Sequence, residues 1–405
     1  MVFFESVSKS TIKILIFLIS IDRICKNVKK GAKDMANILD YLEWRGDLDF
    51  KKSKFNEIDS LILSRFSYFP LDGLFKNDKK ITIKEAYERF LEKGEKNCRI
   101  LQAEDLQLFP AMAKSTRFGD LYITDFINKI DKEEEKQFCA VTILLPNNVM
   151  YVSYRGTDNT LVGWKEDFNL SFDSDVPSQH DAVDYLERVA KELNGKIMIG
   201  GHSKGGNLAV YAGIFCSSEA KKRIIEVYNH DGPGMNSMVI ETKQYKNSVK
   251  KIHTYVPQSS VIGRLLYHEE QYTVIQSVEK GIMQHDLYSW QVLGQKFVTL
   301  DEVTNGSEIV DKVIKSWLDG VTPKQREEFV NILYQIISST DAETLSELSS
   351  NWVKNAGKVL KAYQTSDEES KKIISQTLTA VFSLTKESLI NSFKNNEKDK
   401  KELKK

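Results

Sequence analysis

The spacing of hydrophobic positions changes twice along the chain. Between residues 37 and 113, apolar side chains recur every three or four positions, which predicts helices. Between residues 121 and 278, short runs of apolar and β-branched residues alternate with helical segments, which predicts strands joined by helices. Beyond about residue 299 the helical spacing returns. Strands that alternate with helices form a mainly parallel sheet covered on both faces. The chain is therefore predicted to be an α/β protein with a helical C-terminal region.

The individual elements follow from this pattern. Asn147 and Asn148 favour a tight turn, so the apolar runs on either side of them are predicted to form a hairpin. The predicted strands are Leu121–Ile123, Gln137–Leu145, Val149–Tyr154, Ile197–Ile199, Ile224–Asn229, Ile252–Val256 and Tyr272–Val278. The predicted helices are Asn37–Trp44, Phe55–Phe66, Ile83–Lys93, Gln102–Ala113, Asp181–Leu193, a helix after Ser203, Ile309–Leu318, Arg326–Ser338, Thr344–Leu360 and Lys371–Phe393.

These elements suggest how the chain is organised. Residues 35–300 are predicted to form an α/β domain, residues 301–393 a helical region and residues 394–405 a charged tail that frays. The helical region is interpreted mainly as a packing appendage. A partner-binding or membrane-surface element is the alternative interpretation.

Residues 1–34 do not fit a folded domain. The apolar run Ile14–Ile21 is too short to span a membrane, which takes about 20 apolar residues, and no small-residue cleavage site follows it. Lys29–Ala32 back-translates readily to a purine-rich stretch that resembles a bacterial ribosome-binding site. We therefore expect that Met35 is the natural start and that residues 1–34 are a translated upstream extension.

The composition limits the classes of function. Lys plus Arg and Asp plus Glu both number 57 among the 405 residues, so the formal net charge is zero. A general nucleic-acid-binding protein would need a basic excess, so no nucleic acid is expected as a partner. The cysteines form neither a C-x-x-C pair nor a cluster with histidine, which disfavours a zinc site. Their scatter favours a reducing compartment, and we expect the cytoplasm.

The clearest candidate chemistry lies between Lys196 and Gly213. A short apolar run ends in glycines, and G-H-S-K-G then places Ser203 between Gly201 and Gly205, ahead of a helical segment. A serine at the tip of a sharp turn between a strand and a helix is typical of a nucleophile elbow. A glycine-rich turn without chemistry is the plainer alternative. The flanking strand and helix favour Ser203 as a nucleophile.

A serine nucleophile needs a general base, and His285 is the candidate. His253 lies inside a predicted strand and His268 precedes the last predicted strand, whereas His285 lies in the loop directly after it. In α/β-hydrolases the triad follows the order Ser, Asp or Glu, His along the chain. The loop after the last strand is therefore where the base is expected.

Asp231 is the candidate acid that orients the base. It ends the strand after the elbow helix, in a turn rich in glycine and proline. The next strand ends at Pro257, where no carboxylate follows. Glu269 and Glu270 remain distant alternatives. Asp286 is adjacent to the histidine, so its side chain is expected to point elsewhere.

The oxyanion hole is expected to use two backbone N–H groups. The first belongs to Lys204, directly after the nucleophile at the start of the helix. The second should come from a loop after an earlier strand, and Thr157 in the run R-G-T is the candidate. His202 is expected to pack in the elbow, and Arg155 to form a structural ion pair. This chemistry requires no metal and no organic cofactor.

The same residues carry a resemblance to known families. The lipase class three group of α/β-hydrolases is similar in V-S-Y-R-G-T-D, W-K-E-D-F and G-H-S-K-G-G-N-L-A-V. The bacterial Mbeg-like family, a domain of unknown function, is similar in Y-N-H-D-G-P-G, V-P-Q-S-S and G-I-M-Q-H-D-L-Y-S-W. Mbeg-like proteins also resemble this chain in M-A-N-I-L-D-Y-L-E-W-R-G-D, which favours the start at Met35.

The resemblance to the lipase group implies that residues 35–300 form an α/β-hydrolase domain. It also implies ester hydrolysis through an acyl-enzyme. It implies Ser203 as nucleophile, His285 as base and Thr157 as oxyanion residue. Those lipases usually place the acid after the later strand, where this chain has Pro257-Gln258-Ser259, so Asp231 departs from their pattern. The resemblance to the Mbeg-like family implies no particular substrate.

These features predict a cytoplasmic serine hydrolase, of the carboxylesterase or lipase type, that acts on a small-molecule ester or a lipid. No integral membrane span is expected, and the oligomeric state stays open. The alternative is an α/β-hydrolase scaffold with a weak triad that acts as a binding or regulatory protein.

Overall fold

The computed structural model describes residues 35–304, apart from residues 96, 97, 99, 132, 134, 135, 159, 160, 171–175 and 280, together with residues 316, 320–338, 358 and 361–376. The proposed upstream extension 1–34 and the charged tail 394–405 lie outside the described residues. So do the predicted helices 309–318 and 344–360, except for residues 316 and 358, and the part of the predicted helix 371–393 beyond residue 376.

The chain divides into two compact units. The sheet unit contains residues 32–158 and 173–303, and the helical unit includes residues 159–172 and 304–405. Segment 159–172 interrupts the sheet unit in sequence and is grouped with the C-terminal residues. The predicted domain limits at residues 34, 300 and 393 stay a prediction.

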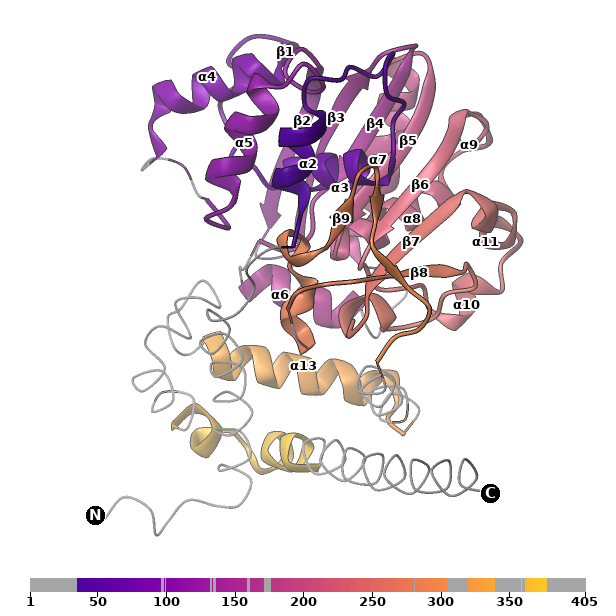
Figure 1. Ribbon diagram of the computed structural model, residues 1–405. Helices are drawn as coiled ribbons and strands as arrows, with labels where there is room; N and C mark the ends of the chain where they lie inside the picture. Colours follow the sequence, from indigo (N-terminus) through magenta and orange to yellow (C-terminus); the bar gives the residue numbers. More distant parts are fainter. Residues whose placement is uncertain are drawn as a thin grey trace, which may run out of the picture. The chain divides into compact units, whose positions relative to one another are not determined.

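A nine-stranded sheet forms the centre of the sheet unit (Figure 1). The five strands from β4 to β8 are parallel neighbours, and the outer strands pair antiparallel. The order across the sheet is β1 (Lys80–Thr82), β2 (Tyr122–Asp131), β3 (Lys136–Leu145), β4 (Val149–Tyr154), β5 (Lys196–His202), β6 (Ile224–His230), β7 (Ile252–Pro257), β8 (Tyr272–Ile275) and β11 (Thr299–Leu300). A separate pair consists of β9 (Val292–Leu293) and β10 (Lys296–Phe297).

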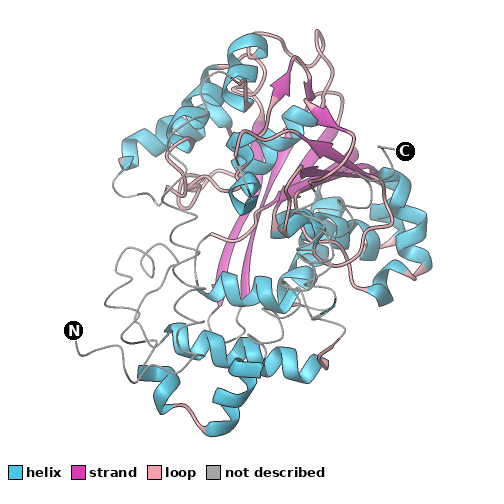
Figure 2. Cartoon of the chain, turned by 60° about the horizontal axis from the view of Figure 1, so that its bottom comes forward, coloured by secondary structure: helices cyan, strands magenta, loops and turns pink. Residues whose placement is uncertain are grey.

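Helices cover both faces of the sheet, and Figure 2 shows the strands as a twisted layer between them. Tyr151 and Val152 are neighbours on β4 but belong to different hydrophobic clusters, because successive strand side chains point to opposite faces. The helices of the sheet unit are α2 (Ile38–Arg45), α3 (Glu57–Phe66), α4 (Ile83–Lys93), α5 (Asp105–Lys114), α7 (Pro177–Glu192), α8 (Lys204–Phe215), α9 (Ser218–Arg223), α10 (Ser237–Ile240) and α11 (Lys243–Ser248).

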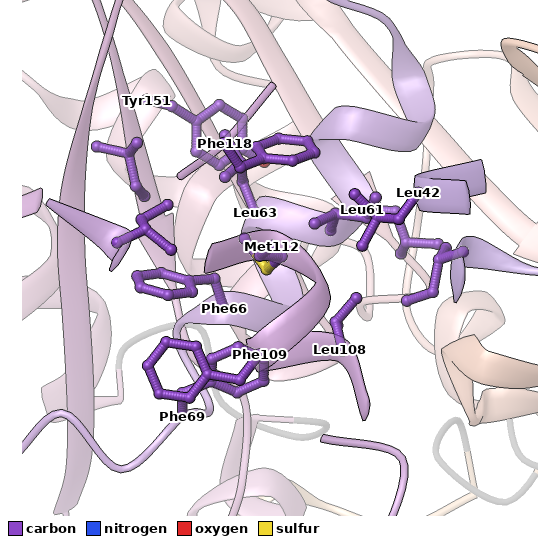
Figure 3. Packing of buried hydrophobic residues seen from close by; sticks show 14 of the residues in the cluster. Leu42, Leu61, Leu63, Phe66, Phe69, Leu108, Phe109, Met112, Phe118 and Tyr151 are labelled. Atoms are coloured by element: carbon purple, nitrogen blue, oxygen red, sulfur yellow. The ribbon is translucent and has the colours of Figure 1, made fainter. Parts of the chain in front are cut away.

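The cluster on one face joins the N-terminal helices to the sheet. Figure 3 shows Leu61, Leu63 and Phe66 of α3 packed with Phe109 and other residues of the N-terminal segments and with the sheet. The other cluster is formed by α7 and α8 against β4, β5 and β6. Because α3 lies on β4 and β5 opposite α8, the residues after α3 come close to the end of β5.

Local sequence explains where the N-terminal helices begin. Asn37 and Asn56 precede α2 and α3, and each side chain accepts a hydrogen bond from a backbone N–H of the first turn. The Thr82 side chain does the same for α4, and the Glu85 carboxylate accepts a hydrogen bond from the Thr82 N–H. These capping boxes satisfy N–H groups that lack a partner inside the helix.

The helical unit contains α6 (Leu161–Leu170) and α13 (Pro323–Ser338), which pack against each other. The ammonium of Lys165 lies 4.8 Å from the ring centroid of Tyr334. Residues 361–365 and 368–376 are also helical. Among the described helices of the chain, none combines the length and the apolar character that a membrane crossing needs.

The predicted fold class is confirmed: the protein is a mixed α/β structure with a largely parallel central sheet, helices on both faces and C-terminal helices. The predicted hairpin is confirmed, with both asparagines of its turn at positive φ. Three strand lengths were wrong. The strand predicted at Ile197–Ile199 spans Lys196–His202, because Gly200 and Gly201 stay paired with β4 and β6. β2 continues to Asp131 past an irregularity at Thr124, where polar residues interrupt the apolar pattern. β8 ends at Ile275, because Gln276 then bonds to Val298 and Gln291.

Candidate active site

The elbow around Ser203 joins β5 directly to α8 (Figure 1). Ser203 has φ 59° and ψ −135°, a conformation that costs non-glycine residues about 1–3 kcal/mol. Its N–H donates to the His230 carbonyl at 2.9 Å. A Cβ at Gly205 would lie 2.1 Å from the Tyr154 carbonyl oxygen, so only glycine fits the first turn of the helix. The sequence forms a strained turn with a serine at its tip.

Asp231 and His285 form a direct hydrogen bond. The distance from His285 Nδ1 to Asp231 Oδ2 is 2.6 Å. Asp231 is fully buried, whereas a quarter of the His285 side chain is exposed. A carboxylate accepts hydrogen bonds, so the hydrogen of this bond is assigned to Nδ1, and Nε2 is the nitrogen left for proton transfer. This tautomer is the one that a general base needs.

Ser203 is linked to this pair through its chain neighbours. The His230 carbonyl, which binds the Ser203 N–H, belongs to the residue before Asp231. His202, the residue before Ser203, donates from Nε2 to the His285 carbonyl at 2.8 Å. Within the described residues no hydrogen bond joins Ser203 Oγ to His285. Catalytic hydrogen bonds are often long before substrate binds, so this geometry remains compatible with a triad.

The loop that carries His285 is held at two successive carbonyls. Trp290 donates from its indole nitrogen to the Gln284 carbonyl at 2.8 Å, and His202 binds the next carbonyl. The ring centroids of His202 and His285 lie 4.6 Å apart. Burial, together with the neighbouring His285, keeps the pKa of His202 well below its usual range. His202 is therefore neutral, and it supports the loop as a hydrogen-bond donor.

The loop after β4 passes directly against the serine. A Cβ at Gly156 would lie 3.0 Å from Ser203 Cβ, and Thr157 follows as a half-buried residue. The Gly156 N–H donates to the Tyr68 hydroxyl at 2.9 Å, so this amide is already engaged. The Tyr68 hydroxyl lies 3.1 Å from the His202 carbonyl oxygen, to which it donates.

Lys204 begins α8, where backbone N–H groups point beyond the helix end. Its side chain is buried and donates from Nζ to the Gln137 carbonyl at 3.0 Å, so only its backbone can contribute to an oxyanion hole. Arg155 forms an ion pair with Asp158 at 3.7 Å and donates to Asn128 at 2.9 Å. The arginine thus has the structural pairing that the sequence suggested.

The carboxylates of Glu270 and Asp286 have hydrogen-bond partners outside the candidate site. Glu270 accepts from His268 Nδ1 at 2.9 Å and from Thr254 at 2.6 Å. Burial raises the pKa of Glu270, but the hydrogen bond with His268 and the other donors outweigh it and lower the pKa to about 2. Asp286 accepts from the Tyr288 N–H at 3.1 Å, so its side chain serves the following turn.

No group of three or more His, Cys, Asp or Glu side chains in the described part of the chain is arranged to hold a metal ion.

Sequence reasoning missed two residues of this site. Tyr68 lies in the loop after α3, far from any motif, and no signal in the sequence points to it. Ser260 donates to Asp231 Oδ1 at 2.5 Å. Its segment was noted because it lacks a carboxylate and because V-P-Q-S-S resembles the Mbeg-like family, but no role was given to Ser260. Two serines directly after a strand were the available signal.

The chain is similar to known proteins in two of three comparisons. No curated protein matches it. Among solved structures, the "Crystal structure of M37 lipase" matches with 13% identity and a TM-score of 0.31, over 50% of this chain and 68% of that one. A model of the Mbeg1-like family matches residues 112–335, more than half of the chain. The predicted family is thereby confirmed, and the chain belongs to the Mbeg1-like family.

Proposed function

We propose that the protein is a serine hydrolase that cleaves a carboxylic ester through an acyl-enzyme. Ser203 is the nucleophile, His285 the general base and Asp231 the acid that orients it. The backbone N–H groups of Thr157 and Lys204 form the oxyanion hole. The substrate is a small-molecule ester or a lipid, and the location is the cytoplasm.

The reaction has two halves. Ser203 Oγ attacks the ester carbonyl carbon while His285 Nε2 takes the hydroxyl proton, and the carbonyl oxygen becomes an oxyanion bound by the two N–H groups. The intermediate collapses, and the alkoxide leaves with the proton from His285, which leaves Ser203 acylated. Water then gives its proton to His285 and attacks the acyl carbon. The acid product departs as Ser203 regains its proton.

The hydrogen bond between His285 and Asp231 supports this proposal most strongly. It joins two residues that are 54 positions apart. The His285 carbonyl accepts a hydrogen bond from His202, and the carbonyl of His230, directly before Asp231, accepts one from the Ser203 N–H. A buried carboxylate that binds Nδ1 of a partly exposed histidine prepares Nε2 for proton transfer. The strained backbone of Ser203 is also typical of a nucleophile elbow, in which the serine hydroxyl is exposed at the end of the sheet.

A fluorophosphonate probe tests the proposal. It should label the wild-type protein and fail to label Ser203→Ala, and both proteins should show the same circular dichroism spectrum. Hydrolysis of p-nitrophenyl esters of increasing chain length then ranks short esters against lipid-like ones. If the folded wild-type protein is not labelled, the result would instead support the alternative function, an α/β-hydrolase scaffold that acts as a binding or regulatory protein.

A further inference from the structure

The second oxygen of Asp231 is held by the loop after β7. Ser260 Oγ donates to Asp231 Oδ1 at 2.5 Å, and the Gly263 N–H donates to the same oxygen at 3.2 Å. The Gly263 N–H also lies 3.1 Å from Ser260 Oγ. Asp231 and Ser260 are both buried. The carboxylate thus accepts from three donors, of which only His285 belongs to the proposed triad.

This loop also limits where the carboxylate can lie. Gly263 belongs to the short turn η3 (Ile262–Arg264), and a Cβ on it would lie 2.2 Å from Asp231 Oδ1. The Asp231 backbone is held as well, because its N–H donates to the Tyr255 carbonyl at 2.8 Å. The two carboxylate oxygens therefore face different loops. Oδ1 meets the turn after β7, and Oδ2 meets the loop of His285.

We infer that Ser260 and Gly263 are positioning residues that form a socket for the carboxylate of Asp231. Charge in a buried place is costly unless hydrogen bonds satisfy it. Donors on Oδ1 stabilise the ionised form and fix the rotation of the carboxylate, so that Oδ2 faces His285 Nδ1. The loop after β7 carries no acid at this position. Its Ser260 hydroxyl instead orients the carboxylate of Asp231, which follows β6.

This inference rests on the proposed function for its kinetic consequence and on the structure for its geometry. Removal of a hydrogen bond to a charged group should lower kcat of Ser260→Ala by about 10- to 100-fold. KM should change by less than about twofold, because the hydroxyl does not touch substrate. Gly263→Ala should lower kcat further, since its methyl group displaces the carboxylate.

The experiment compares Ser260→Ala, Gly263→Ala and the control Ser248→Ala on p-nitrophenyl acetate. Ser248 is also a buried serine, and its hydroxyl donates to the Gln244 carbonyl within α11 at 2.9 Å. The proton NMR signal of His285 Nδ1–H, assigned by its absence from His285→Ala, is recorded for each protein. We expect this signal to move or exchange faster in Ser260→Ala and to stay unchanged in Ser248→Ala.

Two results would overturn the inference. One is a folded Ser260→Ala with the wild-type kcat and the wild-type Nδ1–H signal. The other is an equal loss of kcat in Ser248→Ala, which would indicate a general effect of lost stability. If the folded wild type neither hydrolyses esters nor reacts with the fluorophosphonate, the proposed function fails. The NMR signal alone then decides whether Ser260 holds Asp231 against His285.

Discussion

Asp231 shows how one residue can combine strain with chemistry. Its φ is 53°, in the left-handed region where short polar side chains are tolerated better than most. Its N–H donates back to β7 at Tyr255, and its side chain lies between the two loops that hold it. The backbone turn at the end of β6 therefore fixes the carboxylate before any substrate is present.

Asp231→Asn tests the acid directly. Asparagine also tolerates positive φ, so the turn should persist, but its amide favours the wrong tautomer of His285. We expect kcat to fall by up to about 10⁴-fold while the protein stays folded. Ester hydrolysis and circular dichroism measure the two effects. Turnover near the wild-type rate would reject Asp231 as the acid.

Tyr68→Phe tests the link between the loop after β4 and the elbow. The variant leaves the Gly156 N–H without its acceptor, which should cost about 1–3 kcal/mol of unfolding free energy. We also expect kcat to fall about tenfold, because the loop beside Ser203 loses its support.

Tyr185→Phe is the matched control for this change. The Tyr185 hydroxyl is also buried and has two partners, the Asp125 carbonyl at 2.8 Å and Thr142 at 2.9 Å, but it lies on α7. Urea unfolding should show a similar loss of stability in both variants. Only Tyr68→Phe should lose activity, and an equal kcat in the two variants would contradict the proposed link.

At the scale of elements, the parallel strands explain why sequence reasoning could identify the candidate loops. Thr157, Ser203, Asp231 and His285 follow β4, β5, β6 and β8, whose carboxyl ends lie at one edge because the strands are parallel. Apolar runs bounded by turn residues were sufficient to locate these strands. Which side chains fulfil the proposed roles stays a prediction.

Other contacts could not be predicted, because they depend on packing between distant segments. Tyr68 reaches His202 only because α3 lies on β4 and β5, and nothing near residue 68 encodes that position. β2 was predicted too short for a similar reason. Its second half is polar, and it is recognisable as a strand only through its pairing with β3.

The junction of β5 and α8 makes a further test possible. In Gly205→Ala the new methyl group meets the Tyr154 backbone at 2.1 Å, and backbone atoms cannot yield cheaply. We expect a loss of more than about 3 kcal/mol of unfolding free energy.

Gly213→Ala in the same helix is the comparison. Its nearest neighbour would be the flexible end of Ile199 at 3.1 Å, and alanine favours a helix over glycine by about 1 kcal/mol. That variant should stay close to wild type in urea unfolding. Similar losses in the two variants would show that the close approach at the elbow is not the cause.

At the scale of the whole molecule, the family match crosses both units. It begins within α5 and ends within α13, so it contains the five proposed site residues, the helix α6 and most of α13. Tyr68 and the helices α2 and α3 lie before it. The proposed chemistry thus lies within the matched region, and one of its supporting contacts comes from outside.

Two buried histidines should make the whole molecule sensitive to acid. Burial lowers the pKa of His230 to about 3, with His253 adding to the effect, and burial keeps the pKa of His202 well below its usual range. An unfolded histidine has a pKa of about 6.5. Below that pH these histidines are protonated in the unfolded chain but stay neutral in the folded protein. The unfolding free energy therefore falls as the pH falls.

Between pH 7 and pH 5, His230 alone should remove about 2 kcal/mol of unfolding free energy, and His202 adds to the loss. Glu270 does not contribute in this window, because its stabilisation is lost only as the pH falls from its usual range toward about 2. Urea unfolding at several pH values measures the loss, and His230→Gln should reduce it by about 2 kcal/mol. Other titrating groups are common to both proteins and cancel in the difference. Parallel pH profiles for the two proteins would mean that His230 accepts a proton in the folded state as readily as in the unfolded chain.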